Sequence, residues 1–175
     1  MPQPGGLYAD HRRELLLGHV GQGGGASSSV RQVLGLDMPM ATAVSDVAAA
    51  RRDYLDESGG RYVHVIADGS VSTTGDLVKA IACGADAVML GTALARAAEA
   101  PGSGWHWGQE AHHASLPRGE RVRVETAGTL EEILHGPSRE AAGRVNFMGA
   151  LRHAMAANGY TDIKEFQRAE LVIAD

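Results

Sequence analysis

The most constraining feature of the sequence is a strand, loop, helix and strand unit between residues 62 and 92. Residues 62–67 are a short, mostly apolar run with several β-branched side chains, as expected for a strand buried on both faces of a parallel arrangement. Thr74 is predicted to cap a helix that Gly84 ends, and a second strand is predicted at residues 87–90. Loops this short indicate right-handed βαβ crossovers, and therefore an α/β fold built on a parallel sheet or barrel.

Helices are predicted on both sides of this unit from capping residues and apolar spacing. Ser45 is a plausible N-cap for a helix over residues 46–57, and another helix is expected over residues 93–99. Thr129 and Glu132 have the spacing of a capping box, which predicts a short helix that ends near His135 and Gly136. A last amphipathic helix is predicted over residues 146–158.

The remaining segments carry less information. Residues 1–22 are poorly specified, with only Leu15, Leu16, Leu17 and Val20 available to form a strand. Residues 101–128 have no helical period and are expected to be a long excursion from the core. His106, His112 and His113 lie in this excursion without the spacing of a metal site, so they are interpreted as surface residues. We expect residues 23–175 to form one structural unit.

Composition excludes several classes of partner. The 175 residues carry a formal net charge of -5, so no basic field draws the chain to nucleic acid or to an anionic membrane. No apolar run is long enough for a signal peptide or a membrane span. Cys83 is the single cysteine, which excludes an internal disulfide and fits a reducing cytoplasm; its position near a helix end favours a structural, buried thiol.

Two polar turns follow the two predicted strands. Asp68, Gly69 and Ser70 end the first strand, and Gly91 and Thr92 end the second. Ligands of parallel sheets and barrels bind at the carboxyl ends of strands, where glycine allows backbone amides to approach a phosphate. A carboxylate at Asp68 suits ribose hydroxyls, so we predict a ribose phosphate site; the alternative is that these residues only shape tight turns.

The block from Ile66 to Thr92, which reads IADGSVSTTGDLVKAIACGADAVMLGT, closely resembles the IMP dehydrogenase and GMP reductase family. The resemblance extends from the Gly23 loop through Asn146-Phe-Met-Gly-Ala-Leu-Arg to Gln167 and is closest to the actinobacterial-type branch. It implies a (β/α)8 TIM barrel and NAD(P)-dependent interconversion at C2 of a purine nucleotide. Asp68 would hold the ribose, and the backbone at Gly69, Gly91 and Thr92 would hold the phosphate of IMP, XMP or GMP.

The loop from Gly23 to Arg31 matches the active-site loop of that family, in which a cysteine attacks the purine. Ser28 stands at the cysteine position here. An alcohol needs a strong adjacent base to act as a nucleophile, and the loop shows none. The same resemblance implies that carbonyl groups of Gly23, Gly25 and Ser28 hold a monovalent cation such as K⁺.

Three further departures bear on activity. Ser70 replaces the family's second glycine, Ala26 replaces a phosphate-binding hydroxyl, and residues 101–128 lack the Arg-Tyr pair that activates water in classical IMP dehydrogenases. A complete barrel needs about 200 or more residues, so the resemblance implies a partial (β/α)8 TIM barrel with roughly the last two to three βα units. We therefore expect a truncated form that is inactive alone and associates through exposed strand edges, for example as a homo-oligomer.

Two other interpretations stay open. Gly21-Gln-Gly-Gly-Gly-Ala26 spells a dinucleotide-binding turn, but the acidic residue at the required distance, Asp46, is predicted at a helix start rather than at a strand end. Alternatively, the chain is a non-catalytic purine nucleotide-binding or assembly module, because Ser28 removes the usual chemistry while the predicted phosphate turns remain.

Overall fold

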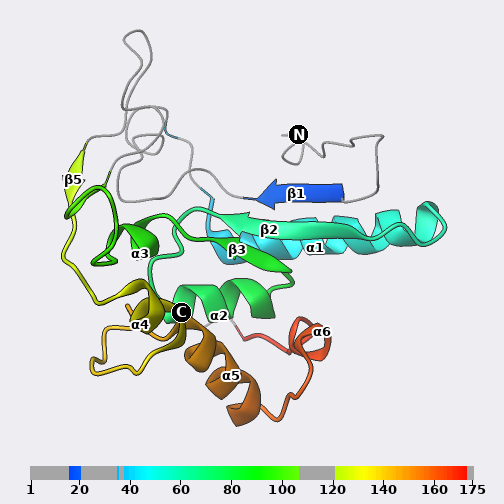
Figure 1. The fold of residues 1–175 in the computed structure, drawn as a ribbon. Helices are drawn as coiled ribbons and strands as arrows, with labels where there is room; N and C mark the ends of the chain where they lie inside the picture. The colour runs from blue at the N-terminus through cyan, green and yellow to red at the C-terminus, as the bar shows by residue number, and fades with distance from the viewer. Residues whose placement is uncertain (1–15, 21–34, 36–37, 107–120, 173–175) are drawn as a thin grey trace, which may run out of the picture.

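A computed structural model describes residues 16–20, 35, 38–106 and 121–172, with the side chains of residues 16–20 excepted. Its centre is an open, fully parallel sheet in the order β1 (Leu16–Val20), β2 (Val63–Asp68) and β3 (Ala87–Met89) (Figure 1). The α/β class is thereby confirmed. The open sheet is compatible with part of a barrel. The predicted strands were each misplaced by one residue, because Asp68 still pairs within β2 and Leu90 no longer pairs within β3.

Two helices cover one face of this sheet. Alternate residues of β2 are fully buried, and they pack in one core with α1 (Met40–Glu57) and α2 (Thr74–Ala82). The side chains at the centre of this core include Val44 of α1, Val65 and Ala67 of β2, and Leu77 and Ile81 of α2. The predicted apolar face of α2 is confirmed by the burial of Leu77, Ala80 and Ile81.

The helix α1 begins six residues before the predicted position. Ser45 was expected to cap it, but the helix starts after Pro39, whose side chain makes no capping hydrogen bond. Ala43 and Val44 are buried in the core together with Ala48 one turn later. Burial of this apolar face therefore extends the helix through the predicted cap.

Two further boundaries differ from prediction. Thr73, not Thr74, caps α2, because its hydroxyl accepts the amide of Asp76 while the Asp76 carboxylate accepts the amide of Thr73. The helix after β3, α3, covers only Thr92–Ala95 instead of residues 93–99. It stops because the backbone beyond it pairs elsewhere: the Arg96 carbonyl accepts Ala127 N–H, and Ala98 N–H donates to Gly128.

The excursion predicted at residues 101–128 contains an ordered element. Trp105–His106 (β4) and Val122–Arg123 (β5) form an antiparallel pair beside α3. After it, α4 (Leu130–His135) has the predicted capping box between Thr129 and Glu132. The helix α5 (Phe147–Ala157) is bounded by Asn146 and Asn158 as predicted, and packs on α2. A short unpredicted helix, α6 (Ile163–Phe166), follows.

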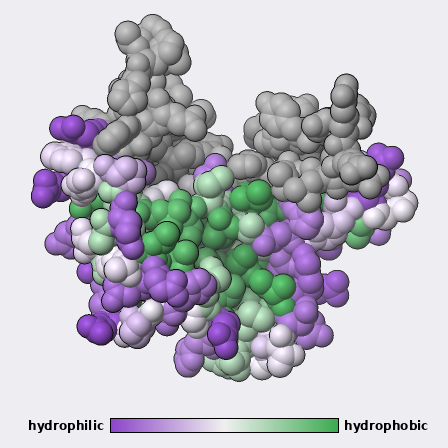
Figure 2. All heavy atoms as spheres, in the orientation of Figure 1, coloured by the Kyte–Doolittle hydropathy of each residue, from purple (hydrophilic) through white to green (hydrophobic). Residues whose placement is uncertain are grey.

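The second face of the sheet is more exposed. Ile66 pairs with Ala87, and Asp68 pairs with Met89, so these four side chains point to the same face. Ile66 and Asp68 are half-buried, while Ala87 and Met89 are exposed. Figure 2 shows apolar side chains gathered across the middle of the molecule, over the sheet and α2.

The prediction of exposed strand edges is corrected in part. Strand β2 is paired on both sides, so the outer strands of this sheet are β1 and β3. Cys83 is only half-buried, although it does pack against the core at the end of α2. No helix in the described parts of the chain combines the length and the apolar character needed to span a bilayer.

Candidate functional site

The two predicted turns leave the sheet side by side. Strands β2 and β3 are parallel neighbours, and Asp68, the last residue of β2, lies opposite Met89. Gly69 and Ser70 follow the first strand, and Gly91 follows the second after one intervening residue. The register therefore brings the candidate ribose-binding carboxylate and both glycine turns to the same edge of the sheet.

Gly91 is not required by the backbone. Its φ of -104° is negative and therefore outside the left-handed region that favours glycine. A Cβ atom built there would lie 3.9 Å from the nearest neighbouring atom, Cε1 of His106, which is an ordinary contact distance. Among the described residues, no neighbour therefore requires glycine at this position. Thr92 is buried, with 6% of its surface exposed, which favours the loop backbone over its side chain as the ligand-binding part.

The turn after β2 has a different character. Gly69 has a φ of +103°, and Ser70 has a φ of +56°. These values lie in the left-handed region that favours glycine. The family's second glycine, which Ser70 replaces here, therefore corresponds to a backbone conformation that serine adopts with strain.

The amino terminus of α2 is already occupied by the chain's own carboxylate. One oxygen of Asp76 accepts hydrogen bonds from Ser72 N–H at 3.3 Å, Thr73 N–H at 3.0 Å and the Thr73 hydroxyl at 2.7 Å. Burial tends to raise the pKa of Asp76, but the hydrogen bonds from Thr73, Lys79 and Ser72 outweigh it and lower the pKa. Thr74 N–H donates to the Gly143 carbonyl at 2.7 Å. The backbone amides of Ser72, Thr73 and Thr74 are therefore already engaged by groups of the chain itself.

An arginine fixes the two turns relative to each other. Arg96, at the end of α3, donates a hydrogen bond from Nη1 to the Ser72 carbonyl at 3.3 Å. Ser72 lies just after the β2 turn, and α3 begins at the β3 turn. The contact therefore connects the segments that follow both strands.

A cavity of about 620 Å³ lies beside α3 and β4. Its lining is mainly apolar and includes Leu94, Glu99, Ala100, Trp105, His106 and Leu130. His106 is half-buried, and burial lowers the pKa of its imidazole. The same side chain is the nearest described neighbour of a Cβ built on Gly91. Sequence reasoning treated His106 as a surface residue and missed this placement.

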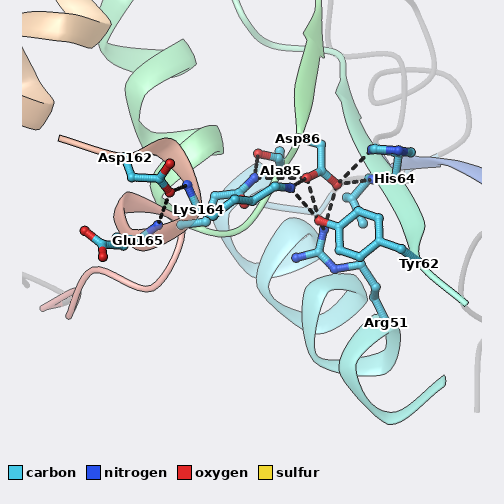
Figure 3. A network of polar contacts seen from close by, with 10 residues as sticks. Arg51, Tyr62, His64, Ala85, Asp86, Asp162, Lys164 and Glu165 are labelled. Atoms are coloured by element: carbon cyan, nitrogen blue, oxygen red, sulfur yellow. Dashed lines mark hydrogen bonds and ion pairs between the residues drawn. The ribbon is translucent and has the colours of Figure 1, made fainter. Parts of the chain in front are cut away.

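A second polar cluster lies at the opposite end of the sheet, around Asp86 (Figure 3). Its carboxylate is only 8% exposed, and it accepts hydrogen bonds from Arg51 Nη1 at 2.7 Å, the Tyr62 hydroxyl at 2.7 Å, Val65 N–H at 2.9 Å, Gln167 Nε2 at 3.2 Å and Lys164 Nζ. Burial tends to raise the pKa of Asp86, but these donors outweigh it and lower the pKa to about 2. With both oxygens engaged, this cluster connects α1, the sheet and α6 structurally.

Several predicted site residues lie outside the described residues. These are Ser28 at the family's cysteine position and the proposed K⁺ carbonyls of Gly23, Gly25 and Ser28. Asp46, required by the dinucleotide-turn interpretation, lies exposed within α1 rather than at a strand end. Within the described ranges there is no group of three or more histidine, cysteine or acidic residues able to hold a metal ion.

Comparison with known proteins gives one consistent family. The model of the IMP dehydrogenase / GMP reductase domain matches residues 17–174. An uncharacterized oxidoreductase of Mycolicibacterium smegmatis is 51% identical over 99% of this chain and 49% of its own length. The inosine-5'-monophosphate dehydrogenase of Aquifex aeolicus is 32% identical over 85% of this chain and 32% of its own length.

The structural comparison agrees. The crystal structure of an IMP dehydrogenase/GMP reductase-like protein from Corynebacterium glutamicum superposes with a TM-score of 0.81 and 55% identity, covering 86% of this chain and 40% of that one. The chain thus spans about half the length of the curated relatives it matches most extensively.

Acidification is expected to destabilise the fold through Asp86. Its pKa is about 2 in the folded chain against an ordinary 3.8, so its contribution to stability is complete above 3.8 and is lost as the pH falls towards 2. The shift corresponds to about 2 kcal/mol. Urea unfolding between pH 7 and pH 2 should show a shallower acid dependence for Asp86→Asn than for the parent chain. The exposed control Asp53→Asn should match the parent, and equal slopes for all three chains would contradict this assignment.

The two turn glycines should respond differently to alanine. Gly91→Ala should change the free energy of unfolding by less than about 1 kcal/mol, because its backbone is ordinary and the added Cβ meets no close atom. Gly69→Ala should destabilise by about 1–2 kcal/mol, because its φ is positive. Urea unfolding of both variants measures the contrast. Equal destabilisation would mean that Gly91 serves the fold rather than an open space.

Proposed function

Because this chain belongs to the IMP dehydrogenase and GMP reductase family, we propose that it binds a purine nucleoside monophosphate at the turns that follow β2 and β3. The observation that carries the proposal is the pairing of Asp68 with Met89, which brings a carboxylate and two glycine turns to one edge. Asp68 would accept hydrogen bonds from the ribose hydroxyls. The backbone at Gly69, Ser70, Gly91 and Thr92 would hold the phosphate.

Gly91 supports this assignment more directly than the other glycines. Neither its φ nor crowding by neighbouring atoms demands glycine there. A phosphate oxygen hydrogen-bonded to a backbone amide needs such an open approach, since a side chain would occupy the same space. IMP, XMP and GMP share the ribose phosphate that these contacts would recognise, so this part of the site does not distinguish between them.

The reaction class of the complete family site would be hydride transfer at purine C2. NAD(P) would supply the hydride acceptor or donor when bound, with a role in purine metabolism and GMP biosynthesis in a reducing cytoplasm. We assign no NAD(P) contact to the described residues, whose proposed task is to bind and orient the nucleotide. The carbonyls of Gly23, Gly25 and Ser28 would hold K⁺.

Ser28 favours a second candidate, a nucleotide-binding or assembly module without turnover. A serine hydroxyl is a poor substitute for a thiolate in attack on a purine carbon. Binding would persist, because the proposed ribose and phosphate contacts do not include this side chain. NADH formation from IMP, or NADPH consumption with GMP, by the isolated chain would exclude the module and favour an oxidoreductase.

We also propose that the chain associates through the outer edges of β1 and β3. Among the described residues, each has a strand partner on one side only, and Ala87 and Met89 of β3 are exposed on the sheet face next to that edge. A second copy of the chain is the simplest occupant. Light scattering over a range of concentrations measures this association, and a strictly monomeric chain would contradict it.

A double comparison tests the role of Asp68. The parent chain should bind IMP about tenfold more tightly than Asp68→Ala does, because a hydrogen bond to a charged group is lost. The parent should likewise prefer IMP to 2′-deoxy-IMP by about tenfold. Asp68→Ala should bind 2′-deoxy-IMP almost as tightly as it binds IMP, because the substitution and the missing hydroxyl remove the same contact. Isothermal titration measures all four affinities.

The control for this experiment is Asp53→Ala, an exposed change on α1, which should leave both affinities unchanged. Fully additive losses for Asp68→Ala and the deoxynucleotide would show that Asp68 does not contact the 2′-hydroxyl. Absence of IMP binding by the parent chain would refute the proposed nucleotide site itself.

A further inference from the structure

The side chain of His106 faces the proposed phosphate position. It comes from β4, which is about fifteen residues beyond β3 in the chain but packs beside α3. Two atoms on one side of the imidazole, Cε1 and Nε2, lie 3.9 and 4.0 Å from the point where a Gly91 Cβ would stand. The ring therefore presents an edge with a hydrogen-bonding nitrogen to the Gly91 backbone.

The imidazole is the nearest described group in front of Gly91. A Cβ built on Gly91 would lie in ordinary van der Waals contact with the ring. The Cβ position itself is 4.0 Å from Nε2, so an oxygen that accepts a hydrogen bond from Nε2 would have to lie closer to the ring, at about 3 Å from it. If it belonged to a phosphate held by the Gly91 backbone, the ring could donate to it directly.

The charged groups near His106 on the β5 side and along the cavity contact other residues. Arg121, just before β5, and Arg123 of β5 flank Val122, the residue that pairs with His106. Their guanidinium carbons lie 4.3 and 5.5 Å from the Trp105 ring centroid, so both groups are stacked on that neighbouring side chain. Glu99 lines the same cavity as His106, and its carboxylate accepts the Leu130 amide at 2.9 Å.

On the sheet side, Asp68 ends the strand paired with β3. Burial lowers the pKa of the His106 imidazole, which favours the neutral ring in the free chain. An adjacent anion would favour its protonated form.

We propose that His106 is a further substrate-binding residue, which donates a hydrogen bond from Nε2 to the phosphate of the bound nucleotide. This inference rests on the proposed function, because it uses the same phosphate position. It adds a contact from the β4–β5 pair to a site otherwise built from the ends of β2 and β3. His106 would thus link nucleotide binding to the position of that pair.

Proton linkage follows from the proposal. A phosphate next to the ring raises the pKa of His106 in the complex above its value in the free chain. The extra affinity is then fully present below the free-chain pKa and is lost as the pH rises through the pKa of the complex. The second ionisation of the phosphate, with a pKa of about 6, acts in the opposite direction. Comparison of the parent with His106→Gln, whose side chain cannot be protonated in this pH range, separates the two effects.

The experiment titrates IMP into the chain between pH 5.5 and pH 8.5, using the parent, His106→Gln and the control His135→Gln. His135 is an exposed residue at the end of α4. At pH 6 the parent should bind about tenfold more tightly than His106→Gln. The difference should narrow to threefold or less, by rough estimate, at pH 8.5, where the imidazole is neutral. His135→Gln should follow the parent throughout.

A measurement on the unmodified chain guards against loss of folding in the variant. Titration of IMP at pH 7 in buffers of different ionisation enthalpy should reveal proton uptake on binding, whereas inosine, which lacks the phosphate, should bind without it. IMP binding with no proton uptake and with the same pH profile in His106→Gln would overturn the role of His106 while leaving the nucleotide site intact. Failure of the parent to bind IMP at any pH would refute the nucleotide site and this inference together.

Discussion

The pairing of Asp68 with Met89 is the constraint on which the candidate site depends. Parallel strands send their carboxyl ends in one direction, and this register leaves only Leu90 between the end of β3 and Gly91. Packing then maintains the register, because Val65 and Ala67 of β2 are buried against α1 and α2. A shift of one residue would turn these side chains to the exposed face and carry Asp68 into the core side. The same apolar burial that stabilises the sheet therefore sets the site.

The two ends of the sheet have different tasks. At the amino end, Asp86 is nearly enclosed and accepts hydrogen bonds on both oxygens, and these contacts hold α1, β2 and α6 together. At the carboxyl end, the nearest described group in front of Gly91 is the half-buried His106, at an ordinary contact distance from a built Cβ. A carboxylate with donors on both oxygens is a structural contact, whereas a glycine that no described neighbour requires suits a ligand. This contrast favours the carboxyl end as the functional one.

Local signals in the sequence predicted the elements that local interactions stabilise. The β-branched run of β2 and the capping box at Thr129 and Glu132 were both recognisable, and each acts within a few residues. The errors arose where contacts between segments distant in the sequence determine where a helix begins or ends. The early start of α1 depends on burial of Val44, and the early end of α3 depends on pairing with Gly128. The cluster around Asp86 joins residues 35 and 78 positions away, which no local pattern reveals.

Ser70 shows how the site can keep its shape despite an unfavourable residue. A serine at a φ of +56° costs about 1 kcal/mol or more relative to glycine. Such strain persists only where the surroundings determine the backbone, and here the next residues are held firmly. Val71 is buried, and Asp76 accepts the amides of Ser72 and Thr73. Arg96 binds the Ser72 carbonyl as well. The turn is thus fixed by contacts on its far side, so its amides can keep a binding geometry before any ligand arrives.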